Sequence, residues 1–379
     1  MSSILIMTWD GGGNVPPTLG LAAELVRRGH DVRVLGHPRQ EQSVRATGAV
    51  FQAYEGLSTW DPSARTSFAG FVWKYPRLFT DRRFGDAARV AIAAHRPDVV
   101  VVDVLLTAAV AASVSSVAPT IVFVHTVNEF VVSEFARGPV GMLAALKGFS
   151  LTRSLAAADA VVIASSPALA RNAVPANAHY VGPIFGPGEK TPVEADPHAR
   201  RILISLSTIS YVGMLSVLQR IVDAVADLSE DVVVTTGGSI DPSEVRAPAH
   251  VRVRRAISHA ELLPQTALVI GHGGHGTATK ALTAGVPLVI RTMTALGDQA
   301  VVAAAVERAG VGVRLGSRDS VEQIRRTVAA ALHDPGLHER ARALGRELRA
   351  ADGAALAADL LERTAHPARA TTPPRPSAE

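Results

Sequence analysis

Short apolar runs alternate with amphipathic stretches along the first half of the chain. Apolar runs of this length predict buried strands, and the spacing between them predicts helices. Residues 18–29 have helical spacing and end at Gly29, a residue suited to cap a helix C-terminus. We expect parallel strands at residues 4–8, 31–36, 98–103, 120–125 and 160–164.

The same alternation resumes after residues 182–200, where Pro, Gly and charged residues are concentrated as in a linker. Strands alternating with helices form parallel sheets covered on both faces. We therefore predict an α/β protein with two Rossmann-like domains. In the second half, strands are expected at 201–207, 231–237, 250–254, 267–271, 286–291 and 311–315.

These patterns predict an N-terminal domain over residues 1–185, a linker over 186–200 and a C-terminal domain over 201–350. Residues 351–364 are expected to form a helix that packs back towards the N-terminal domain. The tail, 365–379, is rich in Pro, Thr and Ala and is expected to be disordered. Residues 55–85 do not fit the alternation, and we expect a variable loop or short-helix region over a cleft.

Composition narrows the class of protein. The chain is 47% apolar and 19% charged, as in a folded protein, and its formal net charge is +4. No basic run is interleaved with aromatic residues, which argues against nucleic-acid binding. The absence of cysteine excludes disulfides and thiolate metal sites and fits a reducing compartment. The first residues lack the basic segment of a signal peptide, so we expect a cytoplasmic protein.

One uncharged segment, residues 104–124, is long enough to cross a bilayer. It also contains Ser113, Ser115, Ser116 and Pro119. Reading it as a strand end, an Ala-rich helix and the next strand gives an ordinary buried βαβ unit. We expect no membrane span.

The strongest local signal is a glycine-rich turn between a strand and a helix. The strand ends at Gly271, and the sequence HGGHGT (272–277) opens the helix. Glycines let the backbone approach a phosphate closely, and the free amides and dipole of a helix start favour an anion. His272 and Thr277 can add donors to two phosphate groups. The alternative is a plain glycine turn, but the two His and the Thr favour an anion site.

The same turn allows other interpretations. Gly271, Gly273 and Gly276 match a dinucleotide fingerprint, although Arg291 stands where its acidic residue is expected, so an NADP-linked oxidoreductase remains open. His272 and His275 lie three apart with no third ligand nearby, and we expect no metal site. The sequence contains no Gly-x-Ser-x-Gly elbow, Gly-Lys-Ser/Thr phosphate loop, His-Glu-x-x-His or Asp-x-Asp motif.

A second glycine-rich turn follows the first strand. Gly11, Gly12 and Gly13 precede Asn14, and Pro16 and Pro17 follow at the expected helix start. Asn14 is a good helix N-cap, which would make this a tight structural turn. The turn also lies at the carboxyl edge of the sheet, where open α/β folds bind ligands.

Four motifs carry a resemblance to a known family. They are GGGNVPPTLGLA (11–22), SLST (205–208), HGGHGT (272–277) with AGVPLVI (284–290), and Asp298-Gln299. The motifs occur in the order and spacing found in the family 1 glycosyltransferases of the GT-B fold, and the chain resembles this family, especially its bacterial natural-product enzymes. The resemblance implies two Rossmann-like domains whose parallel sheets face each other across a cleft. It also implies an N-terminal domain that binds the acceptor, with Gly12 and Gly13 in the acceptor loop.

The resemblance places the nucleotide-sugar donor in the C-terminal domain, without a cofactor or metal. His272, Gly273, Gly274, Gly276 and Thr277 would hold the diphosphate. Ser207 and Thr208 would add hydroxyl donors, Arg255 to Ile257 would pack on the base, and Asp298 and Gln299 would bind sugar hydroxyls. A helix start can stabilise the leaving diphosphate without a metal.

This sequence departs from the family at the catalytic base. The family uses a His in the first loop, oriented by an Asp after a later strand; here Asn14 stands in the His position and Asp103 in the Asp position. Asn cannot take a proton at ordinary pH. Either Asp103 is the base, or His125 is, or the acceptor ionises easily. A carboxylate base needs a pKa raised by burial. Otherwise Asp103 is a structural cap of the next helix.

Two further departures concern the donor. Lys280 stands where many relatives use a Glu to bind ribose hydroxyls, which a thymidine-diphosphate deoxysugar would tolerate better. The stretch from Pro287 to Gln299 is two residues longer than usual, which places Arg291 and Thr292 near the sugar pocket.

We therefore expect an inverting glycosyltransferase that uses a dTDP- or UDP-sugar and a small apolar acceptor, reacting at a hydroxyl or an activated aromatic carbon. The partners would be small molecules, and the protein a monomer or homodimer. One alternative is a catalytically weak binder of nucleotide sugars, and the other is an NADP-linked oxidoreductase.

Overall fold

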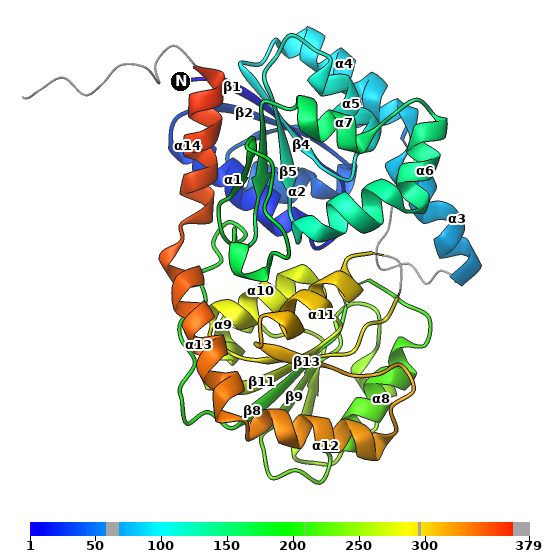
Figure 1. Ribbon diagram of the computed structural model, residues 1–379, viewed down its shortest axis with the longest axis vertical. Helices are drawn as coiled ribbons and strands as arrows, with labels where there is room; N and C mark the ends of the chain where they lie inside the picture. Colours follow the sequence, from blue (N-terminus) through cyan, green and yellow to red (C-terminus); the bar gives the residue numbers. More distant parts are fainter. Residues whose placement is uncertain (58–67, 208, 295–296, 367–379) are drawn as a thin grey trace, which may run out of the picture.

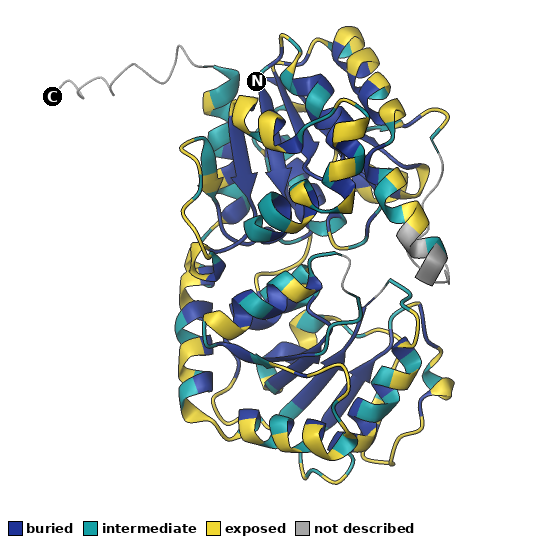
Figure 2. Cartoon of the chain, turned by 45° about the vertical axis from the view of Figure 1, so that its right-hand side comes forward, coloured by how far each residue is buried: buried dark blue, intermediate teal, exposed yellow. Residues whose placement is uncertain are grey.

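The computed structural model describes residues 1–57, 68–207, 209–294 and 297–366. Two parallel sheets, one in each half of the chain, are each covered by helices on both faces (Figure 1). Buried residues follow the strands of both sheets, and exposed residues lie on the outer faces of the helices (Figure 2). The predicted α/β class and two Rossmann-like domains are confirmed.

The N-terminal sheet has seven strands in the order β3-β2-β1-β4-β5-β6-β7. Its strands are β1 Ser3–Met7, β2 Asp31–Gly36, β3 Val50–Ala53, β4 Val99–Asp103, β5 Thr120–Val124, β6 Ala160–Ile163 and β7 Ala178–Tyr180. Its helices are α1 Val15–Arg27, α2 Glu41–Arg45, α3 Phe68–Phe79, α4 Arg82–His95, α5 Thr107–Val114, α6 Pro139–Leu146 and α7 Leu151–Ala157, with short turns η1 Pro38–Gln40, η2 Phe130–Phe135 and η3 Pro167–Leu169.

The C-terminal sheet has six strands in the order β10-β9-β8-β11-β12-β13. Its strands are β8 Arg201–Ser205, β9 Val232–Thr235, β10 Val251–Arg254, β11 Thr266–Gly271, β12 Leu288–Ile290 and β13 Gly312–Arg314. The helices are α8 Met214–Val225, α9 His259–Leu262, α10 His275–Thr283, α11 Gln299–Arg308, α12 Val321–Leu332, α13 Pro335–Ala350 and α14 Gly353–Ala365, with short turns η4 Pro242–Glu244 and η5 Leu263–Gln265.

Every strand expected from an apolar run is present, with bounds that differ by a few residues. Two strands, β3 and β7, were not expected. Both are sheet edges, and their half-exposed residues leave no continuous apolar run to detect.

The order of the strands places a topological switch point in each sheet. The first strand of each half lies between strands that come later in the chain: β1 pairs with β2 and β4, and β8 pairs with β9 and β11. Ligands of open α/β sheets bind at the carboxyl ends of the strands beside such a point. The loops after β1, β4 and β5 therefore belong to one binding edge, and those after β8 and β11 to another.

Two local predictions are confirmed. Helix α1 ends at Arg27, and Gly29 follows with φ +83°, while His30 N donates to Leu25 O as in a Schellman motif. Residues 104–124 contain α5 between β4 and β5. Within the described ranges, no helix has the length and apolar character needed to span a bilayer.

Helix α14 lies against the N-terminal sheet's helix α1, while α13 runs along the C-terminal domain (Figure 1). Arg28 Nη1 donates to Asp359 at 2.6 Å, and His30 Nε2 lies 2.9 Å from Glu362. Ala357, Ala358 and Leu361 on α14 are fully buried. Ala365 ends this helix. The remaining tail, from residue 367, lies outside the described residues, as do residues 58–67 of the expected variable region.

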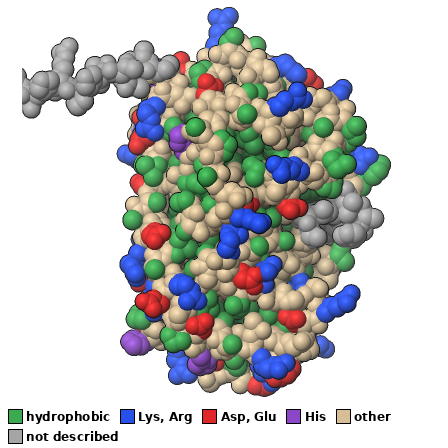
Figure 3. Space-filling view, viewed as in Figure 1, with side chains coloured by type: hydrophobic (Ala, Val, Ile, Leu, Met, Phe, Trp, Pro, Cys, Tyr) green, Lys and Arg blue, Asp and Glu red, His purple; other side chains and the backbone are tan. Residues whose placement is uncertain are grey.

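Acidic and basic side chains are interspersed over the face seen in Figure 3, with no broad basic area on its described part.

Candidate active site

A cavity of about 340 Å³ lies between the binding edges of the two sheets. Its size is in the range of small-molecule sites, and residues of both halves line it. The N-terminal half contributes Trp9, Gly11, Gly12, Gly13, Asn14, Tyr75, Leu105, His125, Thr126 and Phe130. The C-terminal half contributes Ser205, Leu206, Ser207, Ile209, Tyr211, Thr235, Gly237, Arg255, Ala256, Ile257, His259, His272, Gly274, His275, Gly276, Thr277, Gly297, Asp298 and Gln299.

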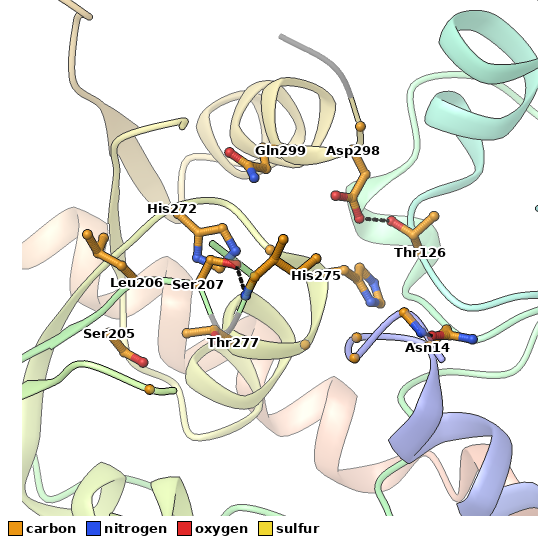
Figure 4. A pocket seen from close by; sticks show the side chains of 18 of the residues that line it. Asn14, Thr126, Ser205, Leu206, Ser207, His272, His275, Thr277, Asp298 and Gln299 are labelled. Atoms are coloured by element: carbon orange, nitrogen blue, oxygen red, sulfur yellow. Dashed lines mark hydrogen bonds between the residues drawn. The ribbon is translucent and has the colours of Figure 1, made fainter. Parts of the chain in front are cut away.

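The start of α10 forms one wall of this cavity. Gly274 is the N-cap, and Gly276 and Thr277 in the first turn line the cavity. Helix geometry leaves the amides of a first turn without carbonyl partners inside the helix. In Figure 4, His272, Ser207 and Thr277 lie together on this side, opposite Asn14. The site can therefore present backbone amides, hydroxyls and an imidazole to an anion.

The two glycines of this turn are required for different steric reasons. Gly273 has φ +88°, and a Cβ there would lie 2.8 Å from the Gln299 carbonyl oxygen. A Cβ on Gly274 would lie 2.4 Å from His272 Nε2. Gly273 itself is not among the residues that line the cavity, and its positive φ shapes the turn.

His272 is buried, and burial lowers its pKa to about 4. The ring is therefore neutral at pH 7 and has one N–H to donate. Its Nδ1 is buried without a hydrogen-bond partner in the described part of the chain. A buried polar atom of this kind is costly unless a ligand or water satisfies it.

The far end of the cavity contains the segment expected to pack on a nucleotide base. Arg255 and Ile257 line the cavity, and the Arg255 guanidinium pairs with Asp241 at 2.7 Å. His259 Nε2 lies 3.2 Å from Ser205 Oγ, and burial together with the charge of Lys280 lowers the pKa of His259 to about 4. Thr208, predicted to bind the diphosphate, lies outside the described residues.

Asp298 and Gln299 lie at the opposite end. Asp298 Oδ2 accepts a 2.6 Å hydrogen bond from Thr126 Oγ1 of the N-terminal half (Figure 4). Burial raises the pKa of Asp298, although this hydrogen bond and the charge of His125 oppose the change. Gln299 Oε1 accepts from the backbone of Met293 at 2.7 Å. Gln299 Oε1 therefore already accepts a hydrogen bond within its own loop, whereas only Oδ2 of Asp298 accepts the hydrogen bond described here from Thr126.

Asn14 and Asp103 are hydrogen-bonded in the N-terminal half, and the His125 ring lies in ion-pair contact with the same carboxylate. Asn14 Nδ2 donates to Asp103 Oδ2 at 3.0 Å, and His125 Nδ1 lies 3.1 Å from the same oxygen. The backbone N–H of Leu105 donates to Asp103 Oδ1 at 3.0 Å. Asn14 and His125 line the cavity, whereas Asp103 lies behind them.

The structure does not show the side-chain caps that the sequence left open for Asn14 and Asp103. Asn14 is the N-cap residue of α1, but its side chain makes no capping hydrogen bond and its Nδ2 donates to Asp103. Asp103 does not cap α5 either, because Leu106 is the N-cap residue and Asp103 binds the turn before it. Arg291 and Thr292 are not among the described residues that line the cavity; the Arg291 guanidinium donates instead to Ser317 O at 3.1 Å.

Lys280 lies outside the cavity lining and pairs with Glu189 of the expected linker at 2.8 Å. His275, considered above as a metal partner of His272, lies 3.3 Å from Ser165 Oγ of the other half. Among the described residues, no group of three or more His, Asp or Glu side chains is placed to hold a metal ion.

Several lining residues were not predicted. Trp9 and Thr126 each lie within two residues of a predicted site residue or glycine loop at the carboxyl end of a strand. Because ligands of α/β folds bind at these strand ends, the sequence could have indicated both residues. Tyr211 follows the SLST motif, and its hydroxyl is hydrogen-bonded by Gln299 and Ser207. Tyr75 lies on α3, within the region 55–85 that was expected over a cleft, although the residue itself was not named; His259 carries no local signal, because tertiary packing alone brings the start of α9 to the cavity.

Models of two protein families match separate parts of the chain. Residues 219–361 match the C-terminal domain of erythromycin biosynthesis protein CIII-like proteins. Residues 17–176 match a model described as glycosyltransferase family 4.

Curated relatives cover part of the chain. It is 34% identical over 199 residues to 4'-demethylrebeccamycin synthase of Lentzea aerocolonigenes, covering 51% of this chain and 46% of the relative. It is 30% identical over 187 residues to the NDP-glycosyltransferase YjiC of Bacillus subtilis strain 168, covering 48% and 47%. Each match thus spans about half the length of the relative.

Solved structures match nearly the whole chain. The calicheamicin glycosyltransferase CalG4 superposes with a TM-score of 0.75 at 25% identity, covering 96% of this chain and 98% of that one. VinC, solved in complex with dTDP, gives a TM-score of 0.70 at 22% identity, covering 96% and 99%. Together with the two facing parallel sheets, these matches show that the chain has the GT-B fold of glycosyltransferases, and part of its sequence is similar to bacterial glycosyltransferases.

Proposed function

We propose that this protein transfers a sugar from a nucleotide-diphosphate donor to a small natural-product acceptor, with inversion at the anomeric carbon. The observation that carries the proposal is the position of the α10 N-terminus. Its first turn, together with neutral His272 and Ser207, faces the Asn14–Asp103–His125 group across one cavity. A donor bound on one wall then presents its sugar to an acceptor on the other.

In this proposal, the diphosphate binds the first turn of α10. The leaving group gains negative charge as its bond to the sugar breaks, and fixed amides at a helix start stabilise that charge without reorganising. The unpartnered Nδ1 of His272 gives this wall a further polar atom that a ligand would satisfy. Ser207 and Thr277 supply hydroxyl donors beside it.

We place the nucleotide between Ser205 and the Arg255–Ile257 segment, and the sugar beside Asp298. Lys280 is held by Glu189 rather than free to meet a ribose hydroxyl. This pairing favours thymidine diphosphate, which lacks one ribose hydroxyl, over uridine diphosphate. Two solved glycosyltransferases with this fold, VinC and the spinosyn rhamnosyltransferase SpnG, are complexes with thymidine diphosphate.

We place the acceptor on the N-terminal wall. Trp9, Tyr75 and Phe130 line the cavity there, although aromatic residues make up only 4% of the chain. Trp9 and Tyr75 both pack edge-on against Phe79, at 4.7 Å between ring centroids. Such a wall fits an apolar acceptor, which would react through a hydroxyl or an activated aromatic carbon.

Titrations with thymidine diphosphate, uridine diphosphate and NADPH test the assignment of the donor site. We expect saturable binding of a nucleoside diphosphate and none of NADPH. The reverse preference would overturn the proposal in favour of an oxidoreductase. A chain that binds a nucleotide sugar but leaves it intact for hours, with and without acceptors, would be a non-catalytic binder.

The transfer rate of a His272→Ala variant tests whether the wall formed by α10 binds the donor. We expect the transfer rate to fall about 100-fold, the usual effect of losing one donor to a developing charge. His250→Ala is the matched control, because His250 is exposed on a loop away from the cavity. Near-normal turnover of the His272 variant would refute the donor assignment.

A further inference from the structure

The ends of three neighbouring strands position Asn14, Asp103 and His125 on the N-terminal side of the cavity. Asn14 lies in the loop after β1, Asp103 ends β4, and His125 follows β5. These strands are adjacent in the order β1-β4-β5 and parallel, so their carboxyl ends meet at one edge. The fold therefore brings the three side chains together at the acceptor side of the cavity.

Asp103 is enclosed by donors. Its Oδ2 faces Asn14 Nδ2 and His125 Nδ1, and its Oδ1 accepts from the Leu105 amide. Its side chain is 1% exposed, and it does not line the cavity. An acceptor hydroxyl in the cavity is therefore separated from this carboxylate by the side chains around it.

His125 is placed differently. It lines the cavity, and its side chain is 10% exposed. His125 Nδ1 lies 3.1 Å from Asp103 Oδ2, so the carboxylate favours the tautomer with its proton on Nδ1, and the neutral ring then has its lone pair on Nε2, at the opposite edge from the buried carboxylate. A carboxylate that orients an imidazole in this way also stabilises the imidazolium that forms when the ring takes a proton.

We propose that His125 is the general base of this site, that Asp103 positions it, and that Asn14 holds Asp103 in place. The inference rests on the proposed transferase function. Nε2 of His125 takes the proton of the acceptor hydroxyl, and the acceptor oxygen forms a bond to the anomeric carbon. The bond from that carbon to the diphosphate oxygen breaks, and its electron pair leaves with the nucleoside diphosphate.

The charged and titratable groups that face His125 come from three elements. They are Asp103 at the end of β4, Asp298 before α11, and His275 of α10. Burial acts to lower the pKa of His125, but the two carboxylates outweigh it and raise that pKa above its usual range. Because only the neutral ring accepts a proton, kcat/KM should rise with pH through a titration above about 6.5.

Substitutions of His125 and Asp103 distinguish the base from its positioning residue. We expect His125→Gln and His125→Ala to lower kcat by about 100- to 10,000-fold and to abolish the acid limb of the pH profile. Asp103→Asn should keep that limb, moved to lower pH, and lower kcat less than His125→Ala does. A His125 variant with wild-type kcat would overturn the inference, as would an Asp103 variant that alone loses the acid limb.

Nucleotide affinity keeps this inference separate from the proposed function. Thymidine diphosphate should bind the His125 variants within about threefold of wild type, because His125 belongs to the opposite wall from α10. Circular dichroism and thermal melting of both His125 variants check folding. If the wild type binds no nucleoside diphosphate, the proposed function fails; if it binds and transfers and His125→Ala transfers equally well, only the assignment of the base fails.

Discussion

The hydroxyl of Thr126 donates a 2.6 Å hydrogen bond to Oδ2 of Asp298, and this contact joins the two halves of the chain inside the cavity. Thr126 follows His125 in the N-terminal half, while Asp298 precedes α11 in the C-terminal half. Because Asp298 is buried, its carboxylate depends on such donors to remain charged. The proposed sugar-binding carboxylate is thus oriented by the acceptor half.

Replacing Thr126 by Val should weaken binding of the sugar part of the donor. A hydrogen bond to a charged group contributes about 1.5–3 kcal/mol, so affinity for a nucleotide sugar should fall roughly 10- to 100-fold. The affinity for thymidine diphosphate, which carries no sugar, should not change. Thr126→Ser, which keeps the hydroxyl, should restore the affinity for the nucleotide sugar. Calorimetric titrations of both ligands measure the difference; equal losses for both would refute the role given to Asp298.

Two glycines of the same turn should respond differently to substitution. A Cβ at Gly276 would meet nothing within 4 Å, so Gly276→Val should fold normally but obstruct the diphosphate. We expect its melting temperature to stay close to wild type and its nucleotide affinity to fall at least 10-fold. Gly273→Ala, with φ +88° and a Cβ 2.8 Å from Gln299 O, should instead lower the melting temperature. Unchanged nucleotide binding by Gly276→Val would show that the anion binds elsewhere.

Acid should destabilise the protein before the carboxylates titrate. Burial lowers the pKa of His272 to about 4 and that of His275 to about 3 from the ordinary 6.5. Below pH 6.5 the unfolded chain takes up protons that the folded chain refuses, so stability is full above 6.5 and falls as pH is lowered towards 4. Each group contributes at most about 1.4 kcal/mol per pH unit.

His125 acts in the opposite sense, since its raised pKa adds stability that is lost as pH rises above 6.5. Urea denaturation of the wild type and His272→Gln at pH 7, 6 and 5 measures the effect. The variant should show the shallower slope between pH 6 and 5. Parallel slopes would mean that His272 is not buried as a neutral ring.

The docking of α14 should contribute measurably to stability. A Cβ at Gly353 would lie 2.4 Å from the Pro183 carbonyl oxygen, so Gly353→Val should displace the start of the helix and expose the buried Leu361. We expect a loss of about 2 kcal/mol or more and faster hydrogen exchange in α14 and α1. Leu356→Ala is the control, because Leu356 on the same helix is 46% exposed. Equal effects of the two variants would contradict the packing described here.

Transfer should not require a divalent cation. In the proposed mechanism, the first turn of α10 stabilises the leaving diphosphate, and no carboxylate-held metal takes part. We expect EDTA to leave the transfer rate within twofold. A loss of activity restored by Mg²⁺ or Mn²⁺ would contradict this part of the proposal.

The sequence by itself determined the α/β class, every strand except β3 and β7, and the turn at residues 272–277. These features are local: continuous apolar runs, helical spacing and glycines leave a direct pattern in the chain. Strands β3 and β7 left no such pattern, because none of their residues is fully buried and neither forms a continuous apolar run.

Only the tertiary structure decided how Asn14, Asp103 and His125 are placed relative to one another and to the cavity. As a sequence, Asn14 reads as a helix cap, and Asp103 is as plausible a base as His125. The order β1-β4-β5 brings loops far apart in the chain to one edge, which turns the Asn14 amide to Asp103 and leaves His125 facing the cavity. The pairing of Thr126 with Asp298, 172 residues apart, likewise exists only because the two sheets face each other. Burial and hydrogen-bond partners are set by such non-local contacts, and they determine which side chain can reach a ligand.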